Sequence, residues 1–170
     1  KYYRKIITNS EIEFIYKFQT TSRVEALNLA INEITSDYAI RYDSRTRFNQ
    51  SYAANAIKIL KGNKYKYIGG VPSILSENKN RVGVFCAGIM RRGYIFLYPR
   101  HRRFHYEGLS SSVYLGCFNS KILKSILYRQ KVNLISEDSL ISSDFKSRGY
   151  TPYLSRLLKL SYVSRSSPAG

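Results

Sequence analysis

A chain of 170 residues, of which 44% are hydrophobic, is long enough to bury a core, and this excludes disorder along its whole length. Its 28 Lys and Arg residues against 11 Asp and Glu residues give a net charge of +17, which predicts a polyanionic partner such as nucleic acid or an anionic membrane surface. No apolar run approaches the roughly 18 residues of a membrane span, and no stretch has the layout of a signal peptide, so a membrane protein is not expected.

Helices are predicted first along the chain. Ser22 and Glu25 match the capping box that begins a helix, and apolar residues then recur at helical spacing as far as Tyr38. A short strand is expected at 39–42, followed by the basic loop "DSRTRF" (43–48). A second helix is expected in "SYAANAIKILKG" (51–62), with Gly62 at its C-cap. Its predicted buried face consists of Tyr52, Ala53, Ala56, Ile57 and Leu60.

Strand patterns follow the second helix. Strands are expected at 64–68, 81–90 and 94–98, and a tight turn at 91–93 would join the last two. Next come a helix from Asn119 to Gln130 and a strand at 131–135. The remainder is Ser-rich and less regular, and has one short amphipathic piece at 153–160.

These elements predict an α+β protein of two small α/β halves, with the order α-β-α-β-β and then β-β-α-β. The N-terminal half would be 23–90, and the C-terminal half, with a serine loop, would be 91–136. Residues 1–22 and 137–170 would be terminal extensions.

Positive charge is concentrated in the middle of the chain. Between Arg45 and Lys131 there are 17 Lys and Arg residues but only two acids, Glu77 and Glu107. Such a stretch is the electrostatic footprint of a nucleic-acid-binding protein, so we expect this segment to face the polyanion.

Cys86 and Cys117 lie in apolar, strand-like contexts. Buried free thiols are the expected state, although the sequence leaves a disulfide open. Two Cys and two His without paired spacing do not predict a zinc site, and no metal or cofactor is expected.

The stretch "YPRHRRFHYEGLSSSVYLG" (98–116) combines both histidines with three arginines, a glutamate and three serines. A Ser/His/acid hydrolase would need the nucleophile on a sharp turn, and no G-x-S-x-G occurs. Neighbouring arginines would lower the basicity of His101 and His105, which suits contact with phosphate better than proton abstraction. Arg, Tyr and Ser side chains can instead bind phosphates, stack on bases and reach 2′-hydroxyl groups.

Enzymatic alternatives fit less well. "NKYKYIGG" (63–70) is similar to half of the GIY-YIG nuclease motif, but the partner tripeptide and the later Arg and Glu are absent. "RYDSR" (41–45) with "SSS" (110–112) is loosely similar to ADP-ribosyltransferase toxins, but no E-x-E follows the serines. No Walker loop or dinucleotide fingerprint is present. A non-enzyme without a small-molecule substrate is expected, and a nuclease or such a toxin is the alternative.

The order of motifs from about Leu27 to Ser136 resembles the eighth protein of the small ribosomal subunit. "SYAANAIKILKGNKYKYIGG" is similar to the family's S-K-L-x-x-x-I-x-x-I-L-K-x-x-G-Y-I helix, and "IMRRGYIFLY" to its strand–turn–strand. "SSSVYLGCFNSKILKSILYRQKVNLI" is similar to its S-T-S-x-G loop, helix and closing strand. Three residues, 113–115, stand where the family's loop has one, Arg92 replaces the proline of the turn, and Arg129 to Lys131 replace a glycine pair with glutamate.

The resemblance implies a structural rRNA-binding protein of a small ribosomal subunit, with neighbouring ribosomal proteins as further partners. A mitochondrial ribosome is expected, with a bacterial or plastid ribosome as the alternative, and another basic ribosomal protein is the competing identification. The family implies that the serine loop and the turn contact RNA, whereas the remaining sites are inferred from charge. The predicted RNA-binding residues are Ser110, Ser111, Ser112, Gly116, Arg91, Arg92, Gly93, Tyr98, Arg100, His101, Arg102, Arg103, Lys58, Lys61, Lys64 and Lys66.

Overall fold

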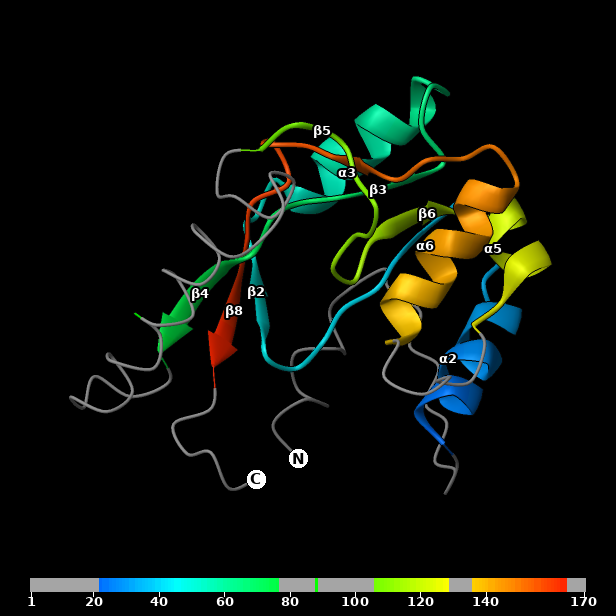
Figure 1. The fold of residues 1–170 in the computed structure, drawn as a ribbon, viewed down its shortest axis with the longest axis horizontal. Coiled ribbons are helices and arrows are strands. Elements are labelled where there is room, and N and C mark those ends of the chain that lie inside the picture. The colour runs from blue at the N-terminus through cyan, green and yellow to red at the C-terminus, as the bar shows by residue number, and fades with distance from the viewer. Residues whose placement is uncertain (1–21, 77–87, 89–105, 129–135, 165–170) are drawn as a thin grey trace, which may run out of the picture.

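The computed structural model describes residues 22–76, 88, 106–128 and 136–164. Four helices in these ranges have bounds α2 Arg23–Asn32, α3 Tyr52–Lys61, α5 Ser120–Ile126 and α6 Glu137–Ser147. The strands are β1 Tyr38–Ile40, β2 Thr46–Phe48, β3 Tyr67–Gly69, β4 Ser73–Ser76, β5 Gly108–Leu109, β6 Cys117–Asn119, β7 Tyr153–Leu154 and β8 Leu160–Ser164. Helices together with two mixed sheets confirm the α+β class (Figure 1).

The larger sheet has five strands in the order β1-β6-β3-β7-β5. Strands β1 and β3 come from the expected N-terminal half, β5 and β6 from the expected C-terminal half, and β7 from the expected C-terminal extension. The sheet therefore joins the segments that the sequence analysis divides. The smaller sheet has the order β2-β8-β4, with β8 antiparallel to β2 and parallel to β4.

The core lies on both faces of the larger sheet, because alternate residues of a strand point to opposite faces. Tyr67 of β3 stacks on Phe118 of β6 with ring centroids 4.6 Å apart, on the face covered by α2, α5 and α6. Their neighbours Ile68 and Cys117 pair in register and pack against α3 on the other face. The sheet is thus enclosed between α3 and the other three helices (Figure 1).

Several sequence predictions are confirmed. Helix α3 lies within the predicted stretch and buries Tyr52, Ala56 and Leu60, while Ala53 and Ile57 are half-buried. Asn119 caps α5 by accepting a hydrogen bond from Ile122 N. Cys117 is a buried free thiol, and burial raises its pKa to about 12. The expected strands at 81–90, 94–98 and 131–135 and Cys86 lie outside the described residues.

Two expectations were wrong. The region after residue 136 is regular, since it contains α6, β7 and β8, and the amphipathic piece at 153–160 spans β7, a turn and the start of β8. Helix α2 ends at Asn32 rather than near Tyr38, because Tyr38 begins the edge strand β1 instead.

The capping box of α2 is formed as the sequence predicts. Ser22 Oγ accepts a hydrogen bond from Glu25 N at 3.3 Å, and Ser22 N donates to Glu25 Oε2 at 2.9 Å. We expect Ser22→Ala to lower the free energy of unfolding by about 1 kcal/mol, measured by urea denaturation. Ser136 caps α6 without a side-chain cap bond, so Ser136→Ala should change stability by less than about 0.5 kcal/mol. Equal losses in the two variants would contradict the assignment.

Candidate nucleic-acid interface

One face of the smaller sheet is polar and positively charged. Arg47 of β2 and Ser73 of β4 both stand opposite Ser161 of β8, so these three side chains share a face. The pairing of β2 with β8 continues beyond the strands through a hydrogen bond from Asn49 N to Lys159 O at 3.1 Å. The opposite face carries Tyr162, which packs toward the rest of the protein.

A hollow of about 480 Å³ lies over this polar face, and we call it the cationic hollow. Its cations are Arg47, Arg156 and Lys159, and its serines are Ser73, Ser155 and Ser161. All three cations are exposed, and no acid belongs to its described lining. A concave surface with one sign of charge concentrates counter-ions, so this hollow attracts anions.

The only acid paired with these cations in the described residues is Glu107. Its Oε2 lies 3.8 Å from Arg156 Nε, and its Oε1 accepts a hydrogen bond from Tyr153 Oη at 2.9 Å. The Arg156 side chain is 62% exposed, so this ion pair is screened by solvent.

This arrangement can bind the sugar-phosphate backbone. Guanidinium and ammonium groups neutralise phosphates and release condensed counter-ions, and hydroxyl groups hydrogen-bond to phosphate oxygens. The hydroxyl groups of Ser73 and Ser161 are already ordered, since their Oγ atoms lie 2.7 Å apart. Ser155 is buried, and its Oγ accepts a hydrogen bond from Leu157 N at 3.3 Å, so this hydroxyl orders the turn after β7.

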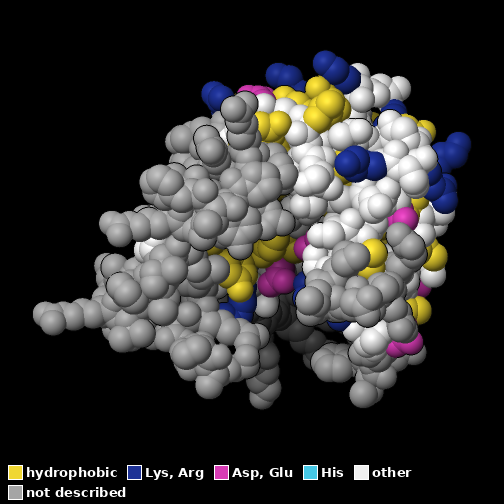
Figure 2. Space-filling model, in the orientation of Figure 1, with side chains coloured by type: hydrophobic (Ala, Val, Ile, Leu, Met, Phe, Trp, Pro, Cys, Tyr) yellow, Lys and Arg dark blue, Asp and Glu magenta, His cyan; other side chains and the backbone are white. Residues whose placement is uncertain are grey.

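A second basic surface follows α3. Lys58 and Lys61 are exposed on its last turn, and Lys64 is exposed beyond its end with its Nζ 5.3 Å from the centroid of the Tyr65 ring. Lys66 is half-buried and donates a hydrogen bond to Asn63 Oδ1. Figure 2 shows Lys and Arg side chains along the upper and right-hand edges of the described surface. No acid occurs between residues 44 and 76, so these four predicted lysines keep their charge uncompensated along the chain.

The three predicted serines differ in their surroundings. Ser110 is 4% exposed, and its Oγ donates to the carbonyl of Ser112 at 2.6 Å while its N donates to Pro152 O at 2.9 Å. Its hydroxyl therefore orders the loop rather than facing a ligand. Ser112 is half-buried, whereas Ser111 has an exposed side chain.

Gly116 is buried beneath aromatic rings. Its φ is +89°, and a Cβ atom there would lie 2.3 Å from Cε2 of Tyr67. Its backbone carbonyl accepts a hydrogen bond from Arg41 N at 3.1 Å. The structure thus gives this glycine a packing role.

The other predicted RNA-binding residues lie outside the described residues. They are Arg91, Arg92, Gly93, Tyr98, Arg100, His101, Arg102 and Arg103.

The most buried charges form an ion-pair cluster beside α6. The Arg41 side chain is 9% exposed, and its Nη1 lies 2.5 Å from Asp138 Oδ1 while its Nη2 lies 3.4 Å from Glu137 Oε1. Although burial acts to lower it, the pKa of Arg41 is raised by the Asp138 carboxylate. Burial raises the pKa of the Asp138 carboxyl, and Arg41 opposes that shift. Both groups are held charged by each other, which is a structural arrangement rather than a proton-transfer site.

The sequence analysis missed Arg156 and Lys159, because it expected an irregular extension there. It noted Arg47 as part of a basic loop but did not connect it to a sheet. The only available signal was the basic, Ser-rich composition of this segment, which does not reveal strand pairing. Lys58 and Lys61, by contrast, were inferred from charge, and the structure places both on the exposed last turn of α3.

The described part of the chain contains no group of three His, Cys, Asp or Glu side chains placed to hold a metal ion. In the same residues, no helix has the length and apolar character needed to cross a membrane. No model of a known protein family matches the chain, and no curated protein sequence matches it significantly.

Proposed function

We propose that this protein is a structural RNA-binding protein of a small ribosomal subunit, with ribosomal RNA as its main partner. The observation that carries the proposal is the cationic hollow, where three exposed cations lie with Ser73 and Ser161 on one concave surface that has no acid in its described lining. The lysines in and after α3 add a second positive surface.

The ribosomal part of the proposal comes from the resemblance to the eighth small-subunit protein. Ribosomal proteins combine a small folded core with a strong positive charge, and the net charge of +17 agrees with that role. We propose a mitochondrial ribosome as the location, with neighbouring ribosomal proteins as additional partners. No described residue group favours a nuclease or an ADP-ribosyltransferase, so neither is proposed.

The proposal predicts salt-dependent binding through the cationic hollow. Each lost phosphate contact makes the negative slope of log K against log salt less steep by about 0.7 to 0.9. The double variant Arg47→Gln, Lys159→Gln should therefore have a slope less steep by about 1.4 to 1.8, and should bind an rRNA fragment about 25- to 60-fold more weakly at 0.1 M salt. Filter binding across a salt series measures both quantities, and intact RNA on a gel afterwards would agree with a non-enzyme.

A charge-matched control variant distinguishes an effect of the cationic hollow from an effect of the protein's net charge. Lys121→Gln together with Lys146→Gln removes the same charge from α5 and α6, on the opposite side of the molecule from the smaller sheet (Figure 1). This variant should keep the wild-type slope. If both double variants lose affinity equally, the cationic hollow is not the binding surface, and if the wild-type protein binds no RNA, the proposed function fails.

A further inference from the structure

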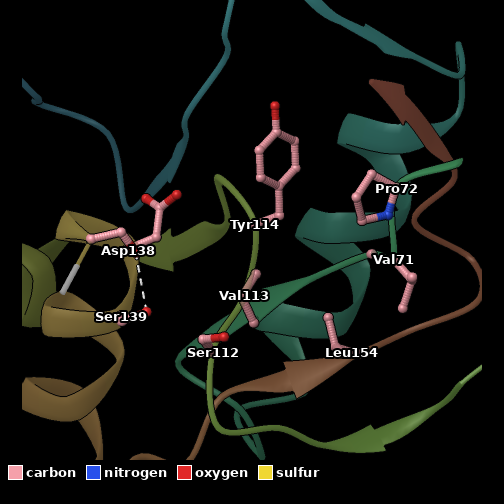
Figure 3. A pocket seen from close by; sticks show the side chains of 10 residues that line it. Val71, Pro72, Ser112, Val113, Tyr114, Asp138, Ser139 and Leu154 are labelled. Carbon is pink, nitrogen blue, oxygen red and sulfur yellow. Dashed lines mark hydrogen bonds between the residues drawn. The ribbon is translucent and has the colours of Figure 1, made fainter. Parts of the chain in front are cut away.

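A second hollow, of about 220 Å³, lies between the loop before β6 and the start of α6. Figure 3 shows Asp138 and Ser139 on one side of it and the ring of Tyr114 beside them. The rest of the lining is mostly apolar and includes Val71, Pro72, Val113 and Leu154, with the Ser112 hydroxyl beside Val113 (Figure 3). A ligand here would meet apolar side chains along its body and a carboxylate at one edge.

The carboxylate of Asp138 is held in place within this hollow. Its Oδ1 accepts a hydrogen bond from Arg41 Nη1 at 2.5 Å, and its side chain is 21% exposed. Burial raises the pKa of this carboxyl, and the Arg41 guanidinium beside it opposes that shift. In its ion pair with Arg41 the carboxylate only accepts hydrogen bonds. Each of its oxygens can accept more than one donor, so the carboxylate can still bind a ligand that offers N–H groups.

The two hollows adjoin each other. Val71 lines both of them, and Leu154 and Ser155, consecutive in the chain, line one each. A nucleotide bound across Val71 would have its phosphate among cations and its base beside Asp138. That division matches the chemistry of a nucleotide, whose backbone is anionic and whose base has apolar faces and a polar edge.

We propose that the second hollow binds an unpaired guanine base of an RNA strand whose phosphates lie in the cationic hollow; this inference rests on the proposed function. Guanine has two adjacent donors, N1–H and the N2 amino group, on its Watson–Crick edge, and they match the two oxygens of a carboxylate. Adenine and cytosine place an acceptor nitrogen beside their amino group, and uracil places carbonyl groups on both sides of its N–H, so each would bring an acceptor against Asp138.

Two other ligands are less suited to this position. A phosphate would be repelled by the Asp138 carboxylate. An arginine side chain of a partner protein also has paired N–H donors, but Arg47, Arg156 and Lys159 in the adjoining hollow would repel a basic peptide. The same cations attract an RNA backbone, and this favours the base.

The test compares short RNAs that differ at one base. Wild-type protein should bind U4GU4 about tenfold more tightly than U9 or U4AU4 in a fluorescence-anisotropy titration, since a paired contact to a base edge discriminates by about this factor. Replacing the guanine by hypoxanthine, which lacks the N2 amino group, should remove most of the preference. Absence of a preference for guanine, with affinity and salt dependence retained, would overturn the base site and leave the proposed function standing.

Variants of the second hollow test whether the preference for guanine arises there. Asp138→Asn and Ser139→Phe should each reduce the ratio of U4GU4 to U9 affinity to within about twofold. Asp138→Asn removes the carboxylate charge, whereas Ser139→Phe fills the hollow and keeps the Arg41–Asp138 pair. Ser147→Phe lies eight residues further along α6 and outside the lining, so it should keep the full ratio. Equal ratios in Ser139→Phe and Ser147→Phe would overturn the assignment to this hollow.

Two probes distinguish the competing ligands. Guanosine 5′-monophosphate should bind far more weakly than U4GU4, because it lacks the strand that contacts the cationic hollow. Comparable affinity would mean that the site takes a free guanine nucleotide, and this would overturn the RNA part of the inference. Displacement of U4GU4 by N-acetyl-arginine amide would overturn it in favour of a basic protein partner, and failure to bind any RNA would overturn it together with the proposed function.

Discussion

Gly116→Ala is expected to lower the free energy of unfolding by about 3 kcal/mol, which is a large part of the stability of a typical small domain. Two costs add at this position. A non-glycine residue at φ +89° is strained, and its Cβ would lie 2.3 Å from Tyr67 Cε2 and 2.9 Å from Phe118 Cζ. Tyr67 cannot move away easily, because it is fully buried and its Oη donates a hydrogen bond to Val113 O at 3.1 Å.

Gly149 provides the matched control for this prediction. Its φ is +83°, and a Cβ built there would meet nothing within 4 Å. Gly149→Ala should therefore show only the backbone cost, about 1 kcal/mol. Urea denaturation followed by circular dichroism measures both variants, and equal losses would show that Gly116 is not constrained by the aromatic rings above it.

Arg41→Met should destabilise the protein by about 3 kcal/mol at pH 7, since removal of one partner from a buried ion pair leaves the other charge uncompensated. The charge left behind is mainly that of Asp138, whose side chain is 21% exposed. Arg23 contacts Glu137 in the same cluster at 2.9 Å, but its side chain is 62% exposed. Arg23→Met should cost less than about 1 kcal/mol, so similar losses in the two variants would contradict the role of burial.

The cost of Arg41→Met should also depend on pH. Burial raises the pKa of the Asp138 carboxyl above its ordinary value of 3.8, and loss of Arg41 removes an opposing influence. A carboxyl whose pKa is raised by folding favours the folded state below its unfolded pKa, and this contribution is lost as the pH rises through the folded value. Denaturation near pH 4 should therefore show a smaller difference between variant and wild type than denaturation at pH 7.

The sequence predicted those elements whose own residues carry a strong pattern. Helix α3 has a continuous apolar stripe that ends with Leu60, and it was found with its buried face largely right. Helix α6 was missed because Ser and Asp are poor helix formers and only Leu140, Ile141 and Phe145 mark its apolar side. Its stability comes from packing on Tyr67 and Phe118, and the chain segment itself gives no sign of this.

The candidate site was also predictable only in part. The exposure of Lys58 and Lys61 could be predicted, because they lie off the apolar stripe of a helix that the sequence marks clearly. The cationic hollow could not be found, because Ser73 and Ser161 meet across 88 positions of sequence, through a parallel pairing that no local spacing encodes. The sequence also could not distinguish the three consecutive serines at 110–112 from one another. Only the fold shows that Ser110 points inward and is buried.

The position of β8 between β2 and β4 has a consequence for how the chain is made. Residues 160–164 supply the middle strand of the smaller sheet, and residues 153–154 supply a strand of the larger one between β3 and β5. During synthesis, β2 and β4 emerge long before the strand that pairs with both of them. Until β8 has been synthesised, β2 and β4 have no strand to pair with, and exposed strand edges are sites of aggregation. We therefore expect the smaller sheet to form only after residue 164 has emerged, and the nascent chain to need a chaperone to protect β2 and β4 until then.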